Sequence, residues 1–397
     1  MRRMAGSILK VRKESARSVR LAPQRHTVTD LRLLLSGSGG FGVPAVDAHH
    51  TPPERRMAAV ITAAPRSSGR DGALVSMPVA SWARERNLPL LEVEQLRAPS
   101  MQEAIASLDA TVGLLADFGQ IVPAEMLRSV HRGILNLHPS LLPAYRGAAP
   151  IPAAILAGDQ ETGVSTILMD EGLDTGPLVA VQRHQLRGDE DAPRLEAQLS
   201  RLAADGITGT LDRYLAGEIA PIPQPADGAS MTRRLRRSDG EILATWTVDR
   251  AHRAWRAYRP WPGVWISLAP ALERLKLDVV GEPLAGINAP FGSLLVHEEV
   301  LLLGLQGGAL PLLEVTPMGG RRMSGTALIR GRPELLAPLA RIRSCAPQPD
   351  LSPQSPILNH LRSRNSLRIL GLRNTARLRS LMRSGALMPR PGRRSRR

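Results

Sequence analysis

Three polar residues in one stretch of the chain have the side chains needed to move an acyl group onto an amine. Asn136 and His138 lie two residues apart, and Asp174 follows downstream in the stretch 135–177. An amide N–H can donate to a developing oxyanion, and an imidazole beside a carboxylate can give or take a proton. These residue types predict acid–base catalysis of acyl transfer. No covalent nucleophile is needed, and Cys345, the only cysteine, lies far downstream.

The residues around Asn136 and His138 predict that both side chains lie on one face at the end of a strand. Side chains alternate along a strand, so a spacing of two returns to the same face. An apolar pair, Ile134 and Leu135, precedes them, and Pro139 stops the strand. This is the carboxyl end of a strand, where open α/β sheets place their sites.

Asp174 lies in the segment EGLDTGP, between Gly172 and Gly176, which allow close approach of the backbone. Asp170 is the competing carboxylate in this loop, and we expect it to cap or orient the loop. A histidine such as His138 is more often structural than catalytic when it stands alone. The presence of an asparagine and an aspartate in the same stretch favours the catalytic interpretation here.

The phrases NLHPSLLPAYRGAAP and MDEGLDTGP resemble the folate-dependent formyltransferases, and the resemblance extends over residues 31–332. Within that family, the motif RGAAPI and the C-terminal motif VTPMGGRRMSGTALIRG are most similar to those of the enzymes that act on methionyl-tRNA. The resemblance implies transfer of the formyl group of 10-formyltetrahydrofolate to the amino group of methionyl-initiator tRNA, for translation initiation, without a metal. One departure is ADFG at 116–119, where the family has a Tyr before the Gly and no Asp.

The resemblance also implies roles for individual residues. Asn136 is expected to stabilise the oxyanion, His138 to donate a second hydrogen bond and protonate the leaving nitrogen, and Asp174 to hold or charge the imidazole and help take the amine proton. The residues expected to bind folate are Ser140, Leu141, Leu142, Pro143 and Tyr145. Those expected to bind tRNA are Arg66, Arg70, Arg233 and Arg234, for which a solvated basic surface is the alternative.

Alternating apolar runs and helical patterns predict an α/β fold with a Rossmann-like, mostly parallel sheet. Strands are expected at 31–35, 58–62, 111–115, 134–138 and 164–169, and helices at 76–87, 151–156 and 194–215. We expect a catalytic domain at 31–215, a Pro- and Gly-rich linker at 216–230, and a small β-barrel resembling an oligonucleotide-binding fold at 231–335. Within the barrel, 255–265 is expected to be extended.

The net charge of +16 belongs to the ends of the chain. Residues 1–30 carry a net +6 and residues 341–397 a net +13, which leaves the middle at −3. Basicity is therefore weak evidence that the globular part binds RNA. The Arg-rich, acid-poor segment 1–30 predicts a mitochondrial transit peptide and a matrix location. The alternative is a basic N-terminus that carries no targeting signal. The Pro-, Ser- and Arg-rich tail 336–397 fits either tethering to RNA or simple disorder.

Other features limit the class of protein. A single cysteine excludes an intrachain disulfide and favours a reducing compartment, and no apolar run approaches the length needed to span a bilayer. We expect a monomer that does not act at a membrane. His49, His50 and His131 lack partners at metal-ligand spacing and are expected at surfaces or turns.

Three alternatives to the leading interpretation stay open. One is a formyltransferase that acts on a small amine, such as an amino-sugar nucleotide or a purine-pathway amine. Another is a catalytically silent RNA-binding relative. The third is a dinucleotide enzyme, since Gly37, Gly39 and Gly42 fit G-x-G-x-x-G, but the second strand ends without the acidic residue that would hold a ribose. Those glycines otherwise form a tight turn beside the substrate site or a plain strand–helix turn.

Overall fold

The computed structural model describes residues 31–50, 55–68, 73–268 and 272–336. The expected transit segment, the tail beyond residue 336 and Arg70 lie outside these residues. The chain divides into two compact units. The first consists of Met1–His138, Ser165–Gln182 and Ser200–Gln224, and the second of Pro139–Val164, Arg183–Leu199 and Pro225–Arg397.

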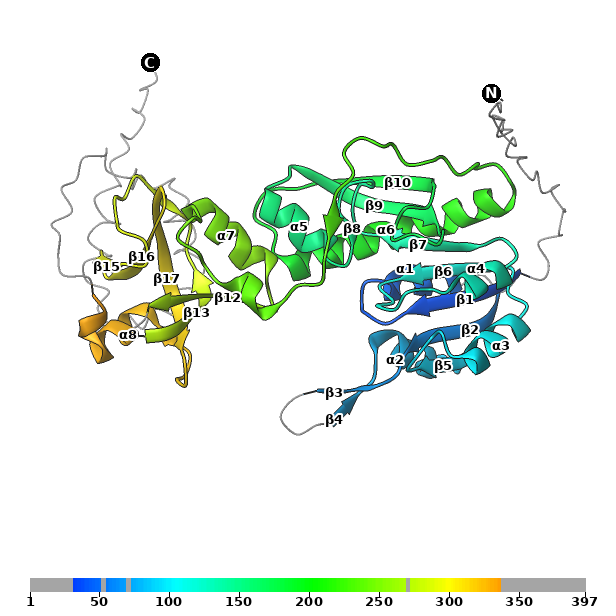
Figure 1. Ribbon diagram of the computed structural model, residues 1–397, viewed down its shortest axis with the longest axis horizontal. Helices are drawn as coiled ribbons and strands as arrows, with labels where there is room; N and C mark the ends of the chain where they lie inside the picture. Colours follow the sequence, from blue (N-terminus) through cyan, green and yellow to red (C-terminus); the bar gives the residue numbers. More distant parts are fainter. Residues whose placement is uncertain (1–30, 51–54, 69–72, 269–271, 337–397) are drawn as a thin grey trace, which may run out of the picture. The chain divides into compact units, whose positions relative to one another are not determined.

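The N-terminal sheet has seven strands in the order β10-β9-β7-β6-β1-β2-β5 (Figure 1). Their bounds are β1 Leu31–Gly37, β2 Arg55–Ala63, β5 Leu90–Val93, β6 Val112–Ala116, β7 Ile134–His138, β9 Glu161–Leu168 and β10 Leu178–Gln185. The strands from β5 to β7 pair in parallel, and β9 runs antiparallel to β7. Each expected strand is present, and the fold class is confirmed. Nearly continuous burial along β1, β6 and β7 agrees with a sheet covered on both faces.

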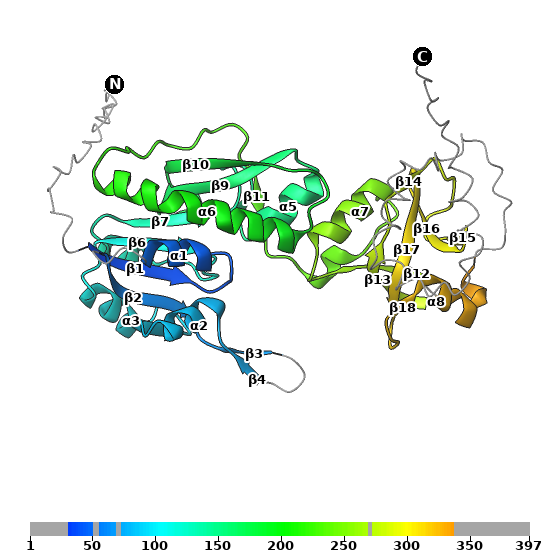
Figure 2. The same ribbon diagram turned by 180° about the vertical axis from the view of Figure 1, so that it is seen from behind.

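Helices cover the two faces of this sheet. They are α1 Val43–His50, α2 Pro78–Glu85, α3 Pro99–Ser107, α4 Ala124–Ser129 and α6 Ala192–Leu215, while α5 Pro150–Ala157 belongs to the second unit. One face packs its strand residues Leu34, Ile61 and Leu115 against Ile105 of α3 and Met126 of α4. In Figure 2, α1 and α6 lie in front of the other face.

The long helix α6 is held by a single apolar stripe. Leu195, Leu199, Ala203, Ile207 and Leu211 recur every four residues, and all are essentially inaccessible to solvent. Such a stripe needs an apolar surface to cover, and burial of these side chains is what keeps the helix in place.

The second domain is built on an antiparallel sheet in the order β12-β13-β17-β16-β15, with β14 and β18 also paired to β17. The strands are β12 Val264–Leu268, β13 Leu272–Val280, β14 Leu284–Ala285, β15 Leu294–His297, β16 Val300–Leu305, β17 Gly308–Pro317 and β18 Met323–Ser324. Helices α7 Val248–Ala257 and α8 Gly325–Gly331 and the 3-10 turns Arg237–Gly240 and Pro333–Leu335 complete it.

The expectation of extended chain over 255–265 was wrong for its first part. Residues up to Ala257 belong to α7, and β12 starts only at Val264. Val248, Ala251, Ala254 and Ala257 share one buried face, and the hydroxyl of Thr247 caps the helix by accepting the N–H of Arg250. The tryptophans in this segment suggested strands. The apolar residues that recur every three residues, together with the capping threonine, instead favour a helix.

Segment 216–230 is hydrogen-bonded along much of its length. Within the first unit, Leu178 and Ile222 exchange two backbone hydrogen bonds of 2.7 and 2.8 Å. Within the second unit, Ser230 bonds to the backbone of Pro143 and Arg146, and β11 (Met231–Thr232) pairs with β8 (Arg146–Gly147). These contacts attach the segment to loops that the sequence predicts to be functional.

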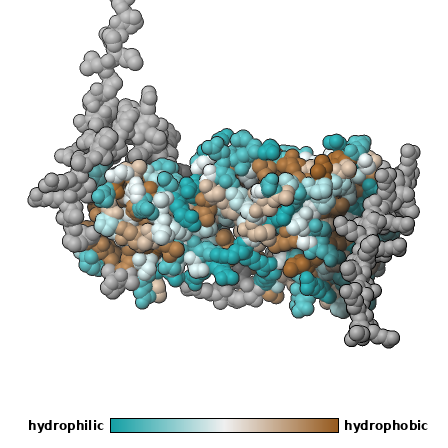
Figure 3. All heavy atoms as spheres, turned by 45° about the horizontal axis from the view of Figure 1, so that its top comes forward, coloured by the Kyte–Doolittle hydropathy of each residue, from teal (hydrophilic) through white to brown (hydrophobic). Residues whose placement is uncertain are grey.

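On the face drawn in Figure 3, hydrophobic residues form separate patches bordered by hydrophilic ones. In the part of the chain that the structure describes, no helix has the length and apolar character to cross a membrane.

Candidate active site

Asn136 and His138 lie on β7, between β6 and β9 in the sheet. Their side chains are on the same face, as the spacing predicts, and they are 6% and 4% exposed. Buried polar groups need hydrogen-bonding or charged partners, because desolvation without them is costly. The structure supplies a shared partner for both.

Asp174 is that partner. Its Oδ1 accepts a hydrogen bond of 3.1 Å from Nδ2 of Asn136, and its Oδ2 lies 3.6 Å from Nδ1 of His138. One carboxylate therefore orients the amide and the imidazole together. The contact with histidine is longer than a normal hydrogen bond and is an ion pair when the imidazole is protonated. Nδ1 is thus the ring nitrogen of His138 that faces Asp174.

The loop that carries Asp174 is ordered by the other carboxylate. Asp170 accepts the backbone N–H of Gly172 at 3.0 Å and the hydroxyl of Thr175 at 2.7 Å. Asp174 itself has φ of 53°, in the left-handed region that only a few non-glycine residues adopt. The prediction that Asp170 orients the loop is confirmed by these contacts, and the catalytic role of Asp174 stays a prediction.

Gly176 is required by close packing in the same loop. A Cβ at this position would lie 1.9 Å from the carbonyl oxygen of Leu168, the last residue of β9. The adjacent Pro177 accepts the N–H of Leu168 at 2.9 Å, which joins the two ends of the loop. The glycine at position 176 therefore reflects a steric need beside the Asp174 carboxylate.

The glycine-rich turn after β1 is occupied by a carboxylate. A Cβ on Gly39 would lie 1.6 Å from an oxygen of Asp117, whose backbone carbonyl also accepts the N–H groups of Ser38 and Gly39. A fixed negative charge against this turn opposes a bound diphosphate. Gly37 and Gly42 pack against Ala116. The glycines thus allow tight packing of the turn on the end of β6, which speaks against the dinucleotide alternative.

The residues expected to contact folate begin the second unit. The hydroxyl of Ser140 donates to the carbonyl of Ala144 at 2.7 Å, and Leu142 and Pro143 are buried. Tyr145 donates its hydroxyl to Asp159 at 2.8 Å, and burial together with that carboxylate raises the pKa of the phenol to about 12. Leu141 is half-buried. The polar atoms of Ser140 and Tyr145 therefore hold the loop in shape, and the folate assignment stays a prediction.

The arginines expected to bind tRNA lie in different settings. Arg66 is exposed on β3 (Arg66–Ser68), which forms a hairpin with β4 (Ala73–Val75). Arg233 makes two hydrogen bonds, of 2.8 and 2.6 Å, to the carboxylate of Asp239. This pairing raises the pKa of Arg233 and lowers that of Asp239. Arg234 is exposed.

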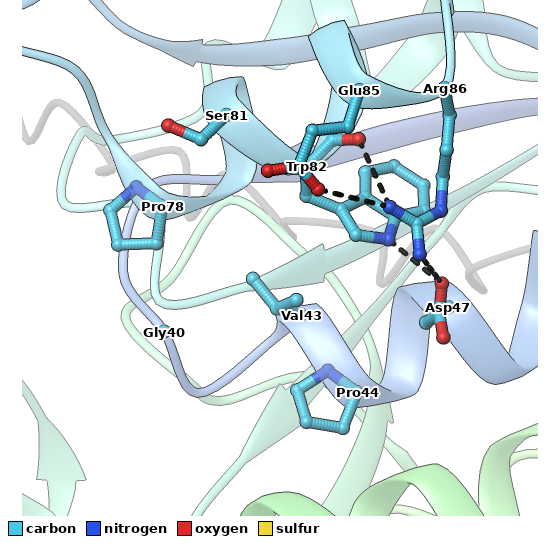
Figure 4. A pocket seen from close by; sticks show the side chains of 9 residues that line it. All are labelled: Gly40, Val43, Pro44, Asp47, Pro78, Ser81, Trp82, Glu85 and Arg86. Carbon is cyan, nitrogen blue, oxygen red and sulfur yellow. Dashed lines mark hydrogen bonds and ion pairs between the residues drawn. The ribbon is translucent and has the colours of Figure 1, made fainter.

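A surface cavity of about 600 Å³ lies between α1 and α2 (Figure 4). Asp47 accepts the indole N–H of Trp82 at 2.9 Å and lies 2.7 Å from the guanidinium of Arg86, which also stacks over the indole. The charged groups of the lining are thus engaged with one another. None of the three catalytic candidates lines this cavity, so it is separate from the site at β7.

The histidines outside the site that the structure describes lie at surfaces or in helices and strands, not in a metal-binding arrangement. His131 pairs with Asp109 at 2.7 Å on the surface, and the side chains of His49 and His50 lie outside what the structure describes. Among the described residues, no group of three or more His, Cys, Asp or Glu side chains is arranged to hold a metal ion.

Residues 31–211 match the formyl transferase family, and residues 234–333 match the formyl transferase C-terminal domain. A methionyl-tRNA formyltransferase of Chloroflexus aurantiacus is 37% identical over 304 residues, covering 76% of this chain and 97% of that protein. One from Thermus thermophilus is 35% identical over 302 residues, covering 76% and 96%. An N-formyltransferase from Helicobacter canadensis, solved with folinic acid and dTDP-3-aminofucose, superposes with a TM-score of 0.54 at 17% identity, covering 71% of this chain and 98% of that one.

The chain therefore belongs to the formyl transferase family. It is an enzyme of one-carbon transfer whose formyl donor is 10-formyltetrahydrofolate, as the sequence predicted. The likeness to the Helicobacter structure shows the fold alone.

Proposed function

We propose that this enzyme transfers the formyl group of 10-formyltetrahydrofolate to the amino group of methionyl-initiator tRNA. The observation that carries the proposal is the similarity, over 76% of this chain and nearly the whole of the relatives, to proteins named methionyl-tRNA formyltransferase, which includes the C-terminal domain. The second domain of about 100 residues offers the extended binding surface that a tRNA needs.

The formyl oxygen gains negative charge when the amine attacks the formyl carbon. Nδ2 of Asn136 carries two hydrogens, and Asp174 accepts only one of them. The second donates to the oxyanion, and Nε2 of His138 donates to it from the same face of β7. A donor already fixed by its neighbours stabilises the tetrahedral intermediate without reorganisation, an effect of about 3 kcal/mol for one donor.

Collapse of the intermediate breaks the bond from the formyl carbon to the folate nitrogen. His138 protonates that nitrogen through Nε2, while Asp174 stabilises the imidazolium from the Nδ1 side. The attacking amine loses a proton, which the carboxylate takes directly or through water. The products are the formylated amine and tetrahydrofolate, so protons and bonds balance without any further reactant.

The choice of acceptor is tested by offering several amines. Purified full-length protein, supplied with 10-formyltetrahydrofolate, is expected to formylate methionyl-initiator tRNA and to leave free methionine and an amino-sugar nucleotide unchanged. Product mass and tetrahydrofolate release measure the two halves of the reaction. Formylation of the small amines alone would contradict the tRNA proposal and favour the amino-sugar alternative.

The tRNA contacts predict unequal effects of two arginines. Arg66→Ala is expected to raise KM for tRNA about tenfold, since a guanidinium–phosphate hydrogen bond is a strong charge-assisted one. Arg233→Ala is expected to raise it by about threefold at most, because Asp239 already occupies its guanidinium. Neither change should alter KM for folate. Equal effects of the two variants on tRNA would show that the ion pair opens when tRNA binds.

We further propose that the enzyme works in the mitochondrial matrix and as a monomer. The composition of residues 1–30 supports the first point, and the second is supported by a catalytic trio supplied by a single chain. Import of a fluorescent protein fused behind residues 1–40, and the mass of the purified enzyme by light scattering, test these points. A cytosolic fusion or a dimer mass would refute the respective proposal.

A further inference from the structure

Gln224 contacts the catalytic loop from a part of the sequence that looks like a plain linker. Its Nε2 donates two hydrogen bonds of 2.8 Å, one to the backbone carbonyl of Asp174 and one to that of Gly176. Gln224 is half-buried and is the last residue of the first compact unit. The backbone pair between Leu178 and Ile222 fixes the chain two residues earlier. The segment that carries Gln224 is therefore anchored at Ile222, and this anchor places the side-chain amide at the loop.

The backbone of Asp174 needs such support. Its left-handed φ is costly for a residue with a side chain, and this conformation persists only where surrounding groups enforce it. Asp170 and Thr175, which belong to the loop, constrain it by their own hydrogen bonds. Gln224, which belongs to segment 216–230, constrains it at Asp174, the residue whose carboxylate contacts both Asn136 and His138.

We propose that Gln224 is a positioning residue for catalysis: its side-chain amide fixes the backbone on both sides of Thr175 and thereby holds the Asp174 carboxylate between Asn136 and His138. The inference rests on the proposed function of the trio. It assigns a catalytic consequence to segment 216–230, which has no periodic or motif signal that would reveal it. A misplacement of about 1 Å in a catalytic group lowers a rate by up to about 10²-fold.

Three substitutions separate the role of the amide from that of side-chain size. Gln224→Glu keeps the shape but replaces two donated hydrogen bonds with a carboxylate that faces two carbonyl oxygens. Gln224→Ala removes the contact. Gln224→Lys restores a donor group of similar reach. We expect kcat to fall about 30-fold in the first, about tenfold in the second and by no more than about threefold in the third. KM for folate and for tRNA should stay within about twofold, since the amide is engaged by two backbone carbonyls of the loop.

Gln182→Ala is the matched control. Gln182 is also half-buried in the first unit, and its Nε2 also donates a 2.8 Å hydrogen bond to a backbone carbonyl, that of Leu202 in α6. Loss of this bond should lower the melting temperature by an amount similar to that in Gln224→Ala while kcat is unchanged. The comparison separates a loss of stability from a loss of catalytic geometry.

A double-mutant cycle with Asp174→Ala completes the test. If Gln224 acts only through Asp174, adding Gln224→Ala to Asp174→Ala lowers kcat no further. Independent, multiplying losses, or a normal kcat in Gln224→Glu, would overturn the proposal. The function of the trio is judged separately: a wild-type enzyme that formylates methionyl-tRNA and a slow Asp174→Ala variant keep that function intact, whatever Gln224 does.

Discussion

Replacing Asp174 by alanine is expected to lower kcat by a factor on the order of 10² or more, and the same loss is expected for Asn136→Ala and His138→Ala. Asp174→Ala removes the group that orients the other two, through contacts of 3.1 and 3.6 Å. Steady-state rates with saturating folate and tRNA measure the effect. Folding should be retained in each variant, which circular dichroism and the melting temperature check.

The three residues should also behave as one unit. Because the carboxylate acts through Asn136 and His138, the triple variant is expected to be little slower than the slowest single variant. Asp109→Ala, which removes an exposed aspartate paired with His131 in the same unit, serves as the control and should keep normal turnover. A normal rate in any one of the three single variants would remove that residue from the mechanism.

Gly176→Ala is expected to reduce kcat about 10²-fold without touching any catalytic side chain. The new methyl group would lie 1.9 Å from the backbone carbonyl oxygen of Leu168, and backbone at the end of a central strand cannot yield cheaply. The loop must then move, and Asp174 moves with it. Turnover is measured together with the dissociation constant of a folate analogue. A displaced carboxylate lowers turnover and leaves the affinity for the analogue unchanged, whereas a damaged folate site lowers both.

Gly209→Ala is the matched glycine control. Gly209 lies in α6, and a Cβ there meets no atom within 4 Å. The substitution is expected to stabilise the helix by about 0.5–1 kcal/mol and to leave turnover unchanged. If Gly176→Ala were as active as Gly209→Ala, the loop would be more adaptable than its contacts indicate, and the exact backbone path at Asp174 would be unimportant for catalysis.

The class of fold and the donor of the formyl group follow from the sequence, which also singles out Asn136, His138 and Asp174 as catalytic candidates. Continuous apolar runs such as 31–35 predict buried strands, because a strand that is covered on both faces needs apolar side chains at consecutive positions. The spacing of Asn136 and His138 placed both on one face of a strand, since alternation is a property of the backbone alone. The glycines around Asp174 indicated a tight loop before any contact was known. The helix α7 was missed, because clustered tryptophans suggested strands where small buried alanines decided.

The arrangement of one carboxylate between two partners is visible only in the folded chain. Asp174 is 36 residues from His138 in the chain, and no local pattern states which of its oxygens meets which side chain. The fold also places Asp117 against the glycine-rich turn, pairs Asp239 with Arg233, and brings the amide of Gln224 to the carbonyls of Asp174 and Gly176. Each of these contacts joins residues brought together by the packing of separate segments. The energies of these contacts depend on interatomic distance and burial, and both are set only when the separate segments pack together.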